Sequence, residues 1–536
     1  MGSGNSFKRN AGILMAISSL PSPYGIGTLG KDAYDFVNFV RDTNHKYWQV
    51  LPVGPTTYGD SPYQPYSAFA GNPYFVDLDV LIEDGLLLKS EVLAVDWGDG
   101  FIPVNVSEDD ALNNRFPVNY DGYLGDESYE KMYNGRFVIL RKAYERFKEQ
   151  CVKAKSVLDK GLPIYKKFDN FVKDNADWLK DYSMFMSLKA HFDQKSWGEW
   201  DDDIKFRRAD AMKKYEQELA DDIGYWNFIQ YEFYTQWNRL KEYANSNGIE
   251  IVGDIPIYMG YDSVDVWANQ GEFQLDENLT PVKVAGVPPD AFSDKGQKWG
   301  NPLYDWDKME SDGFLWWRKR MKNSARLYDV IRIDHFLGII KYYTIPYDMP
   351  DARQGSYEQG PGQKLLDAIN ESIGDKKIIA EDLGVSIPEV EQVLEHNNYP
   401  GIKVLEFAFG GDRKNPHLPY NYTRNCICYG GTHDNETLLG FFNERNDGEL
   451  GFAYDYLDTR DKHRMVDMVF RAAYSSVAVI TIFAVQDILK LDNAARMNFP
   501  SSLGNNWKWR MKKGQLNWDH LNAMKYLASV FDRERK

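Results

Sequence analysis

Three acidic residues stand at the ends of short apolar runs, and their type and spacing suit the cleavage of glycosidic bonds. Asp334 ends the run VIRID, Glu381 ends the run IIAE, and Asp434 follows Gly-Thr-His. Retaining glycosidases use a carboxylate nucleophile and a protonated carboxylic acid about 5–5.5 Å apart, and a further anion can stabilise the positively charged transition state. Arg332 lies two residues before Asp334 on the same face of a strand. A guanidinium in that place would keep the nucleophile ionised.

Each acid also has a simpler interpretation. Asp and Glu often follow a strand because they cap the next helix, so Glu381 and Asp434 could be caps. His335 and His433 could be ordinary hydrogen-bonded histidines. Three acids at three strand ends, two of them beside a histidine, are harder to assign to capping alone. The pattern by itself leaves both interpretations open.

The elements that would position these acids are eight short apolar runs, most of them followed by an amphipathic helical stretch. The runs span residues 12–18, 47–53, 249–258, 330–336, 377–381, 401–409, 425–432 and 477–488. Several are almost entirely apolar, which is typical of parallel strands that are buried on both faces. This alternation predicts a (β/α)8 TIM barrel, in which catalytic residues lie at the C-terminal ends of the strands.

One long interruption divides the chain of 536 residues. Residues 77–248 are charged and aromatic, with long helices expected at 136–153, 169–191 and 209–244, and such a segment is too long for a loop. We therefore expect the barrel to begin in 1–76, a helical subdomain to be inserted at 77–248, and the rest of the barrel to follow in 249–536. The stretch 260–309 is rich in Gly, Pro and Asp, so we expect lid loops there over the barrel mouth.

Composition and charge disfavour several other classes of protein. The 63 basic and 79 acidic residues give a net charge of −16, which would repel nucleic acid and anionic membranes. Cys151, Cys426 and Cys428 make neither a disulfide framework nor a zinc motif, so we expect no metal and a reducing compartment. The longest apolar run is too short to span a bilayer, and the N-terminus lacks a signal-peptide core. A soluble, cytoplasmic protein is expected.

Longer motifs resemble those of the 4-α-glucanotransferase family (amylomaltase or disproportionating enzyme), which is related to the α-amylases. The motifs are SSLPSPYGIG at 18–27, LPVGP at 51–55, SPYQ at 61–64, SAFAGNP at 67–73, GDIP at 253–256, GVPPD at 286–290, GQKWGNP at 296–302 and RMN at 496–498. With the three acid-bearing segments, the resemblance covers nearly the whole chain. It implies a (β/α)8 barrel without a C-terminal β domain. It also implies an enzyme that cuts α-1,4-glucans, needs no cofactor, and transfers the released piece to the 4-OH of a glucose or maltooligosaccharide.

The resemblance also implies roles for individual residues. Asp334 would be the nucleophile that forms a covalent glucosyl–enzyme intermediate, Glu381 the general acid/base, and Asp434 the stabiliser of the transition state. The expected substrate-binding residues are Ser61, Tyr63, Asp254, Phe292, Trp299, Asn301, Arg332, His335, His433 and Asn498. The chain departs from the family at Ala291, where many relatives carry Tyr. We expect residues 286–301 to form a mobile lid that retains Phe292 and favours transfer over hydrolysis by excluding water.

Two other functions would use the same features. An α-glucan hydrolase of the amylase group would employ the same three acids, and a glucan-binding protein would keep the fold with an inactive site. The complete acid set with Arg332 disfavours the inactive site. Maltotriose separates the three hypotheses: transfer gives glucose with a ladder of longer chains, hydrolysis gives glucose and maltose, and binding alone gives no product.

Overall fold

A sheet of eight parallel strands forms the centre of the protein in the computed structural model. The structure describes residues 5–57, 60–97, 126–155, 164–289, 293–384, 387–500, 502, 504 and 506–536. The strands are β1 (Asn10–Leu14), β2 (Tyr47–Gln49), β3 (Glu250–Ile255), β6 (Val330–Ile333), β9 (Lys377–Ala380), β10 (Gly401–Val404), β11 (Cys426–Tyr429) and β12 (Ile480–Ala484). Each falls on one of the eight predicted runs, so the expected (β/α)8 barrel is confirmed.

The sheet nearly closes on itself between β9 and β10. The strand order runs β10-β11-β12-β1-β2-β3-β6-β9, which leaves these two strands at the edges. The N–H of Ala380 donates to the carbonyl of Pro400 at 3.1 Å, and the N–H of Ile402 donates to Asp382 Oδ1 at 2.6 Å. A Cβ at Gly401 would lie 2.3 Å from Asp382 Oδ2, so a larger residue would displace this carboxylate. The seam of the barrel therefore depends on a side chain next to Glu381.

Alternation along the strands separates an inner from an outer apolar cluster. Val252, Val330 and Ile379 pack inside the barrel with residues of the other strands, whereas Ile251 and Ile331 pack outside against the helices. Successive side chains of a strand point to opposite faces. Residues two positions further along β3, β6 and β9 therefore also face the interior, at its C-terminal mouth.

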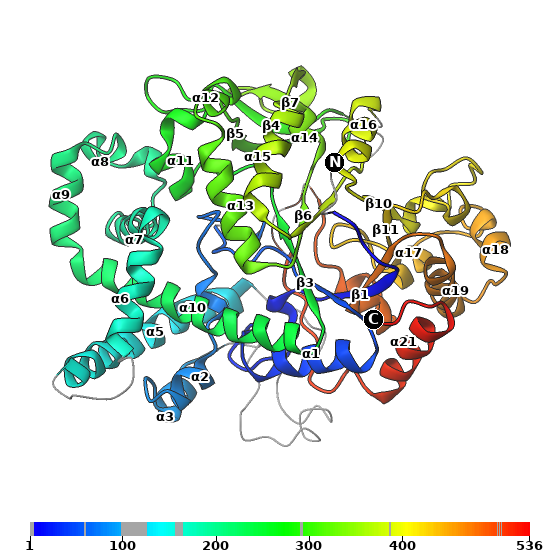
Figure 1. Cartoon of the computed structure of the whole chain (residues 1–536), viewed down its shortest axis with the longest axis horizontal. Coiled ribbons are helices and arrows are strands. Elements are labelled where there is room, and N and C mark those ends of the chain that lie inside the picture. Colours follow the sequence, from blue (N-terminus) through cyan, green and yellow to red (C-terminus); the bar gives the residue numbers. More distant parts are fainter. Residues whose placement is uncertain are drawn as a thin grey trace.

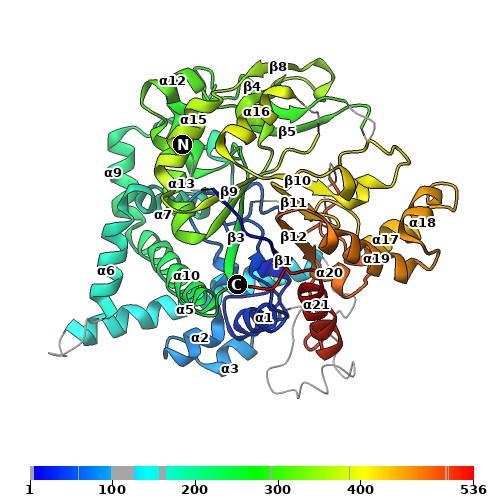
Figure 2. The same cartoon turned by 45° about the vertical axis from the view of Figure 1, so that its right-hand side comes forward.

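Helices surround the barrel, as Figures 1 and 2 show. They include α1 (Lys31–Asp42), α13 (Leu315–Leu327), α15 (Gln363–Ile373), α16 (Pro388–Asn397), α17 (Leu438–Asn443), α18 (Gly451–Leu457) and α19 (Lys462–Ser475). In α1, Ala33, Phe36, Val37 and Val40 are buried, which is the stripe that helical spacing predicts. After β12, the described residues form α20 (Val485–Ile488) and α21 (Trp518–Val530) and no further strand.

Helices also fill the described part of the chain between β2 and β3, and they lie to one side of the barrel in Figure 1. They are α2 (Leu78–Glu83), α3 (Lys89–Leu93), α5 (Asp126–Lys155), α6 (Ile164–Asp174), α7 (Ala176–His191), α8 (Asp202–Lys205), α9 (Ala209–Glu218) and α10 (Ala220–Ser246). Two of the expected helices are each divided, at Asn175 and at Leu219. The side chain of Asn175 donates to the carbonyl of Phe171 at 2.8 Å. This competes with the backbone hydrogen bonds of a continuous helix.

A second sheet occupies part of the region in which only loops were expected. Its strands are β4 (Lys283–Val287), β5 (Gln297–Pro302), β7 (Lys341–Pro346) and β8 (Ser356–Gln359), and their antiparallel order is β5-β4-β7-β8. Along the chain, α11 (Val264–Ala268) precedes β4 and α12 (Trp306–Ser311) follows β5. A Cβ at Gly286 would lie 2.1 Å from the carbonyl oxygen of Gln297. This glycine, which reads as a loop signal in the sequence, thus permits close pairing of β4 and β5.

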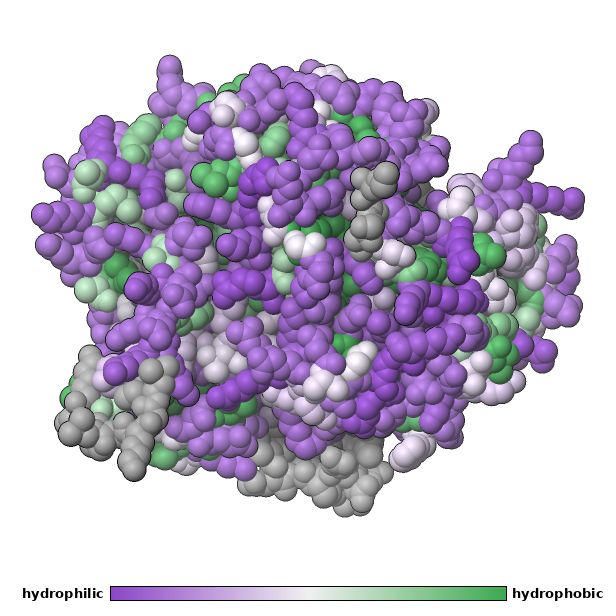
Figure 3. All heavy atoms as spheres, viewed as in Figure 1, coloured by the Kyte–Doolittle hydropathy of each residue, from purple (hydrophilic) through white to green (hydrophobic). Residues whose placement is uncertain are grey.

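The face of the molecule in Figure 3 is mainly hydrophilic, with hydrophobic residues scattered over it. None of the helices within the described ranges is both long and apolar enough to cross a membrane.

Candidate active site

The barrel mouth brings together side chains from the C-terminal ends of three neighbouring strands. Asp254 lies in β3 and Arg332 in β6, Asp334 directly follows β6, and Glu381 directly follows β9. Asp254 and Arg332 are register partners on adjacent strands, and Arg332 is in turn paired with Ile379 of β9. The polar residues continue the interior rows of Val252, Val330 and Ile379, which explains why they face one space.

One cation links two of these acids. Arg332 Nη1 donates to both carboxylate oxygens of Asp254 at 2.6 Å and to Asp334 Oδ1 at 3.0 Å. The side chains of Arg332 and Asp254 are 4% and 0% exposed, whereas that of Asp334 is 26% exposed. Burial lowers the pKa of Arg332, but Asp254 and Asp334 outweigh it and hold that pKa above its usual value. Asp334 is therefore the accessible carboxylate of an otherwise buried ion network.

Glu381 has a different environment. Its Oε2 accepts the N–H of His335 at 2.7 Å, and its Oε1 accepts the N–H of Leu383 at 3.1 Å. Burial raises the pKa of Glu381 to about 8; the negative charge of Asp334 adds to this, and Arg332 opposes it. Glu381 therefore keeps its proton at neutral pH, as a general acid must.

The backbone at His335 brings these two acids together. His335 has a φ of 49°, which lies in the left-handed region. Such a conformation costs about 1 kcal/mol or more in a non-glycine residue and is found mainly where the surroundings require it. The Trp299 ring lies edge-on to the imidazole at 4.8 Å. Burial lowers the pKa of His335, so its ring is neutral beside the two carboxyl groups.

Asp434 lies at the end of the seventh barrel strand and is held from two sides. Its Oδ1 accepts from Asn498 Nδ2 at 2.6 Å, and its Oδ2 lies 3.4 Å from His433 Nε2. Its backbone carbonyl accepts from Arg496 Nη2 at 2.8 Å. The side chain of Asp434 is 45% exposed and that of His433 only 2%. The arrangement fixes a carboxyl group that still faces open space.

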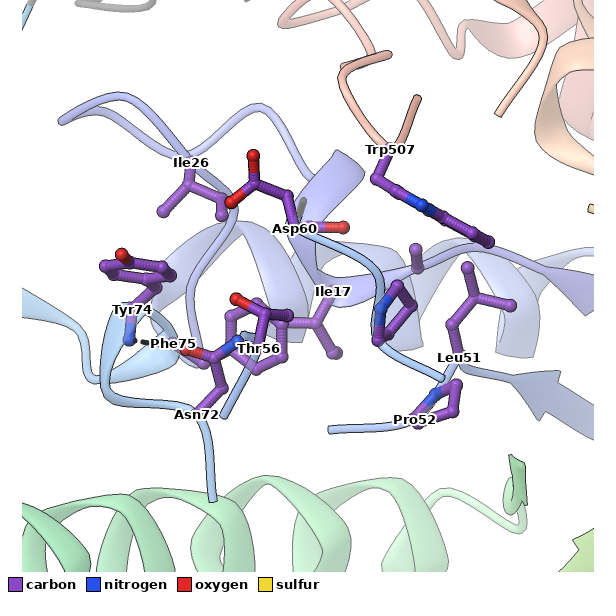
Figure 4. A pocket seen from close by; sticks show the side chains of 13 residues that line it. Ile17, Ile26, Leu51, Pro52, Thr56, Asp60, Asn72, Tyr74, Phe75 and Trp507 are labelled. Atoms are coloured by element: carbon purple, nitrogen blue, oxygen red, sulfur yellow. Dashed lines mark hydrogen bonds between the residues drawn. The ribbon is translucent and has the colours of Figure 1, made fainter. Parts of the chain in front are cut away.

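Tyr63 connects Asp254, which is bonded to Arg332, with His433, which lies beside Asp434. Its hydroxyl donates to Asp254 Oδ2 at 2.9 Å and lies 3.3 Å from His433 Nδ1. Its ring is stacked on His433 with centroids 4.8 Å apart, and Trp507 approaches both rings at 5.7 and 5.8 Å. A cavity of about 30 Å³ lies beside Trp507. In Figure 4 the side chains of Ile17, Leu51 and Trp507 meet there from three segments of the chain.

The structure places the remaining predicted residues less centrally or does not describe them. Ser61 Oγ accepts the N–H of Tyr63 at 3.3 Å, so it supports the local turn. Asn301 is buried in β5. Phe292 and Ala291 lie outside the described residues, and part of the expected lid at 286–301 belongs to the β4–β5 pair.

The sequence motifs do not include Trp507, and they include Arg496 only within RMN at 496–498. Both follow β12 and reach the site through contacts distant in sequence. The one indication in the sequence is that both residues lie close to Asn498 along the chain. No group of three His, Cys, Asp or Glu side chains in the described residues is arranged to hold a metal ion.

A groove of about 1270 Å³ adjoins the site. Gln64 lines it, and the side-chain amide of Gln64 donates to the Trp299 carbonyl at 3.4 Å. The opposite wall comes from the helices between β2 and β3, including Tyr133 of α5 and Trp226 of α10.

A (β/α)8 barrel with a proton-bearing acid and an accessible carboxylate at its mouth has the groups that an enzyme needs to cleave glycosidic bonds. Comparisons with known proteins show to which family within this class the chain belongs. A family model described as 4-alpha-glucanotransferase matches residues 15–517. The chain is 44% identical to a 4-alpha-glucanotransferase of Clostridium butyricum, over 97% of this chain and 100% of that protein.

A 4-alpha-glucanotransferase of Streptococcus pneumoniae is also 44% identical, over 98% of both chains. The solved structure of an amylomaltase from Streptococcus agalactiae, in complex with acarbose, superimposes with a TM-score of 0.88 at 38% identity, covering 98% of this chain and 100% of that one. The chain belongs to the 4-alpha-glucanotransferase family. It is an enzyme that transfers pieces of α-1,4-glucans, and the alternative of a hydrolase is not favoured.

Proposed function

We propose that Asp334 is the nucleophile, Glu381 the general acid/base and Asp434 the transition-state stabiliser of a retaining transfer reaction. The observation that carries this proposal is the contrast between Asp334, partly exposed and bonded to Arg332, and Glu381, buried and proton-bearing. One acid is suited to attack and the other to donate a proton.

The reaction proceeds in two displacements. Glu381 donates its proton to the glycosidic oxygen while an Asp334 oxygen bonds to C1, and the bond between C1 and the leaving glucan breaks. The 4-OH of an acceptor then bonds to C1 as Glu381 takes its proton, and the bond to Asp334 breaks. Two inversions retain the α configuration. Asp434, held by Asn498 and His433, supplies negative charge where positive charge develops.

Transfer requires a sugar hydroxyl to compete with water of much higher concentration. A positioned acceptor overcomes this difference through a high effective molarity. Tyr63 and Trp299 supply aromatic surface at the mouth, and each also contacts a histidine of the site. We assign these rings to sugar binding, because the apolar face of a pyranose packs against an aromatic ring.

We further propose maltooligosaccharides as donors and acceptors, and a cytoplasmic location, which the buried thiols of Cys426 and Cys428 support. We also propose that residues 77–248 form a subdomain that is inserted into a barrel made by residues 1–76 and 249–536. Long donor chains follow the groove that the helices of this subdomain share with Gln64.

Incubation with maltotriose tests the proposal. The parent enzyme should give glucose and a ladder of longer chains, whereas Asp334→Ala and Glu381→Gln should each give neither while remaining folded. Glu395→Gln, in an exposed position of α16, is the matched control and should keep the full ladder. A ladder from either folded active-site variant would remove that residue from the mechanism.

A further inference from the structure

Three acidic side chains gather behind the turn that carries Asp434. Glu406 follows β10, Glu436 follows β11, and Asp487 lies in α20 after β12. Glu406 and Asp487 are only 6% and 3% exposed. None of the three takes part in the reaction described above, and acids buried this deeply are rare unless they are paired.

Glu406 is packed directly against the backbone of that turn. Its N–H donates to the carbonyl of Gly430 at 3.1 Å. A Cβ at Gly431 would lie 2.4 Å from Glu406 Oε1, so the carboxyl group occupies the space beside the Gly431 backbone. Asn435 closes the same turn, because its Oδ1 accepts the N–H of Thr432 at 2.9 Å. The support under Asp434 therefore includes the Glu406 side chain.

The hydrogen-bond donors near the Glu406 carboxyl group are bonded to other acceptors. Glu436 accepts from Arg445 at 2.8 Å and from Asn493 at 3.0 Å. Asp487 accepts the N–H of Leu438 at 2.8 Å. Arg496 donates to the carbonyls of Asp434 and Asn498. Within the described part of the chain, Glu406 Oε1 has no hydrogen-bond partner.

We propose that Glu406 is a positioning residue for Asp434: its carboxyl group, seated against Gly431, fixes the turn that presents Asp434 to the substrate. This inference rests on the transition-state role proposed above for Asp434. Glu406 acts as a neutral acid, because a buried carboxylate without a bonded cation would cost several kcal/mol. Burial raises the pKa of Glu406 well above its usual value; Asp487 and Glu436 raise it further, against Arg496 and Arg445.

The neutral state and the positioning role predict different effects for two substitutions. Glu406→Gln keeps the shape without a charge, so kcat should stay within about threefold of the parental value. Glu406→Ala removes the support, so kcat should fall about 10- to 100-fold, the range expected for a displaced catalytic group. KM should change little, because the loss concerns the transition state. Parental kcat in Glu406→Ala, or an equal loss in Glu406→Gln, would overturn the proposal.

A double-mutant cycle with Asp434→Asn tests whether Glu406 acts through Asp434. An α-maltotriosyl fluoride donor makes the slow variants measurable, since fluoride leaves without a proton. We expect Glu406→Ala to cost little in the Asp434→Asn background, because residues that act as a unit are not additive. Equal losses in both backgrounds would overturn this inference alone. A parental kcat in Asp434→Asn would remove the proposed role of Asp434 and this inference with it.

Infrared spectroscopy at neutral pH tests the protonation state of Glu406 independently of the kinetics. The parent should show a protonated-carboxyl carbonyl band to which Glu381 also contributes, and Glu406→Gln should lose the part of this band that comes from Glu406. Glu395→Gln is the control and should lose none. An unchanged band in Glu406→Gln would contradict the neutral acid.

Discussion

Asp334 and Glu381 lie at the ends of neighbouring strands but differ in exposure and in bonding partners. Asp334 faces Arg332 Nη1 at 3.0 Å, whereas Glu381 accepts only backbone N–H groups, from His335 and Leu383, in the described part of the chain. Backbone donors stabilise the ionised form but do not offset burial here. At the residue scale, the division of labour between two acids is thus a property of their surroundings.

The proton on Glu381 predicts a pH-dependent effect on stability. The unfolded chain releases this proton near the ordinary value of 4.5, whereas the folded protein releases it at about 8. Folding therefore binds a proton between these values, and the parent loses stability as pH rises through this interval. Glu381→Gln lacks this loss. The free energy of unfolding of Glu381→Gln minus that of the parent should therefore increase by about 1.4 kcal/mol for each unit by which pH rises in that interval.

Urea denaturation of both proteins between pH 4 and pH 9 measures this difference. It should level off above about pH 8, where the folded parent is also ionised. A difference that stays constant over the whole range would show that Glu381 has the same pKa in the folded and the unfolded state.

Alternation in the sequence is sufficient to predict some site residues but not others. Asp254, Arg332 and Glu381 continue buried strands, so their common face follows from the period of two. The contact of Asn498 with Asp434 joins residues 64 positions apart. Local sequence rules carry no information on such a pairing, so only the motif resemblance indicated Asn498.

At the element scale, apolar runs predicted all eight barrel strands because both faces of each strand are buried. The sheet of β4, β5, β7 and β8 was not predicted; β4 and β5 contain glycine, β5 and β7 end in proline, and β8 has only four residues. Gly286, at the register shift between β4 and β5, is required by close backbone approach. The division of the expected helix at 169–191 depends on an asparagine side chain, which pattern analysis does not weigh.

The barrel seam gives a prediction for Gly401→Ala. The new Cβ would lie 2.3 Å from Asp382 Oδ2, so the carboxylate must move and release the N–H of Ile402. An unsatisfied buried donor costs about 1–3 kcal/mol. We expect a lower melting temperature and a lower kcat, because Glu381 adjoins the seam. Gly410→Ala, which has open space around it, is the control. Equal melting temperatures for the two variants would exclude a role of the seam.

At the scale of the whole molecule, the barrel and the helices between β2 and β3 jointly form the groove beside the site. The sequence predicted a helical insertion of this kind but not which barrel loop it would face. Packing of aromatic rings that are distant in sequence decides that, as in the contact of Trp237 in α10 with Tyr328 at the end of α13.

The groove predicts a dependence on donor length. Tyr133 lines it and is 40% exposed. Tyr133→Ala should raise KM several-fold for long α-1,4-glucans and leave the kinetics with maltotriose unchanged, because an aromatic–sugar contact of about 1 kcal/mol is lost only for long chains. Tyr526→Ala, at an exposed tyrosine of α21, is the matched control. Equal changes in KM for long glucans and for maltotriose would show that long chains do not bind along the groove at Tyr133.

The identity of the nucleophile is the central claim, and trapping the covalent intermediate tests it most directly. Glu381→Gln should react with α-maltotriosyl fluoride, whose leaving group needs no proton, and then stop because no base activates the acceptor. Mass spectrometry of the digested protein should find the glucanosyl group on Asp334. An adduct on Asp434 or on any other residue would contradict the account.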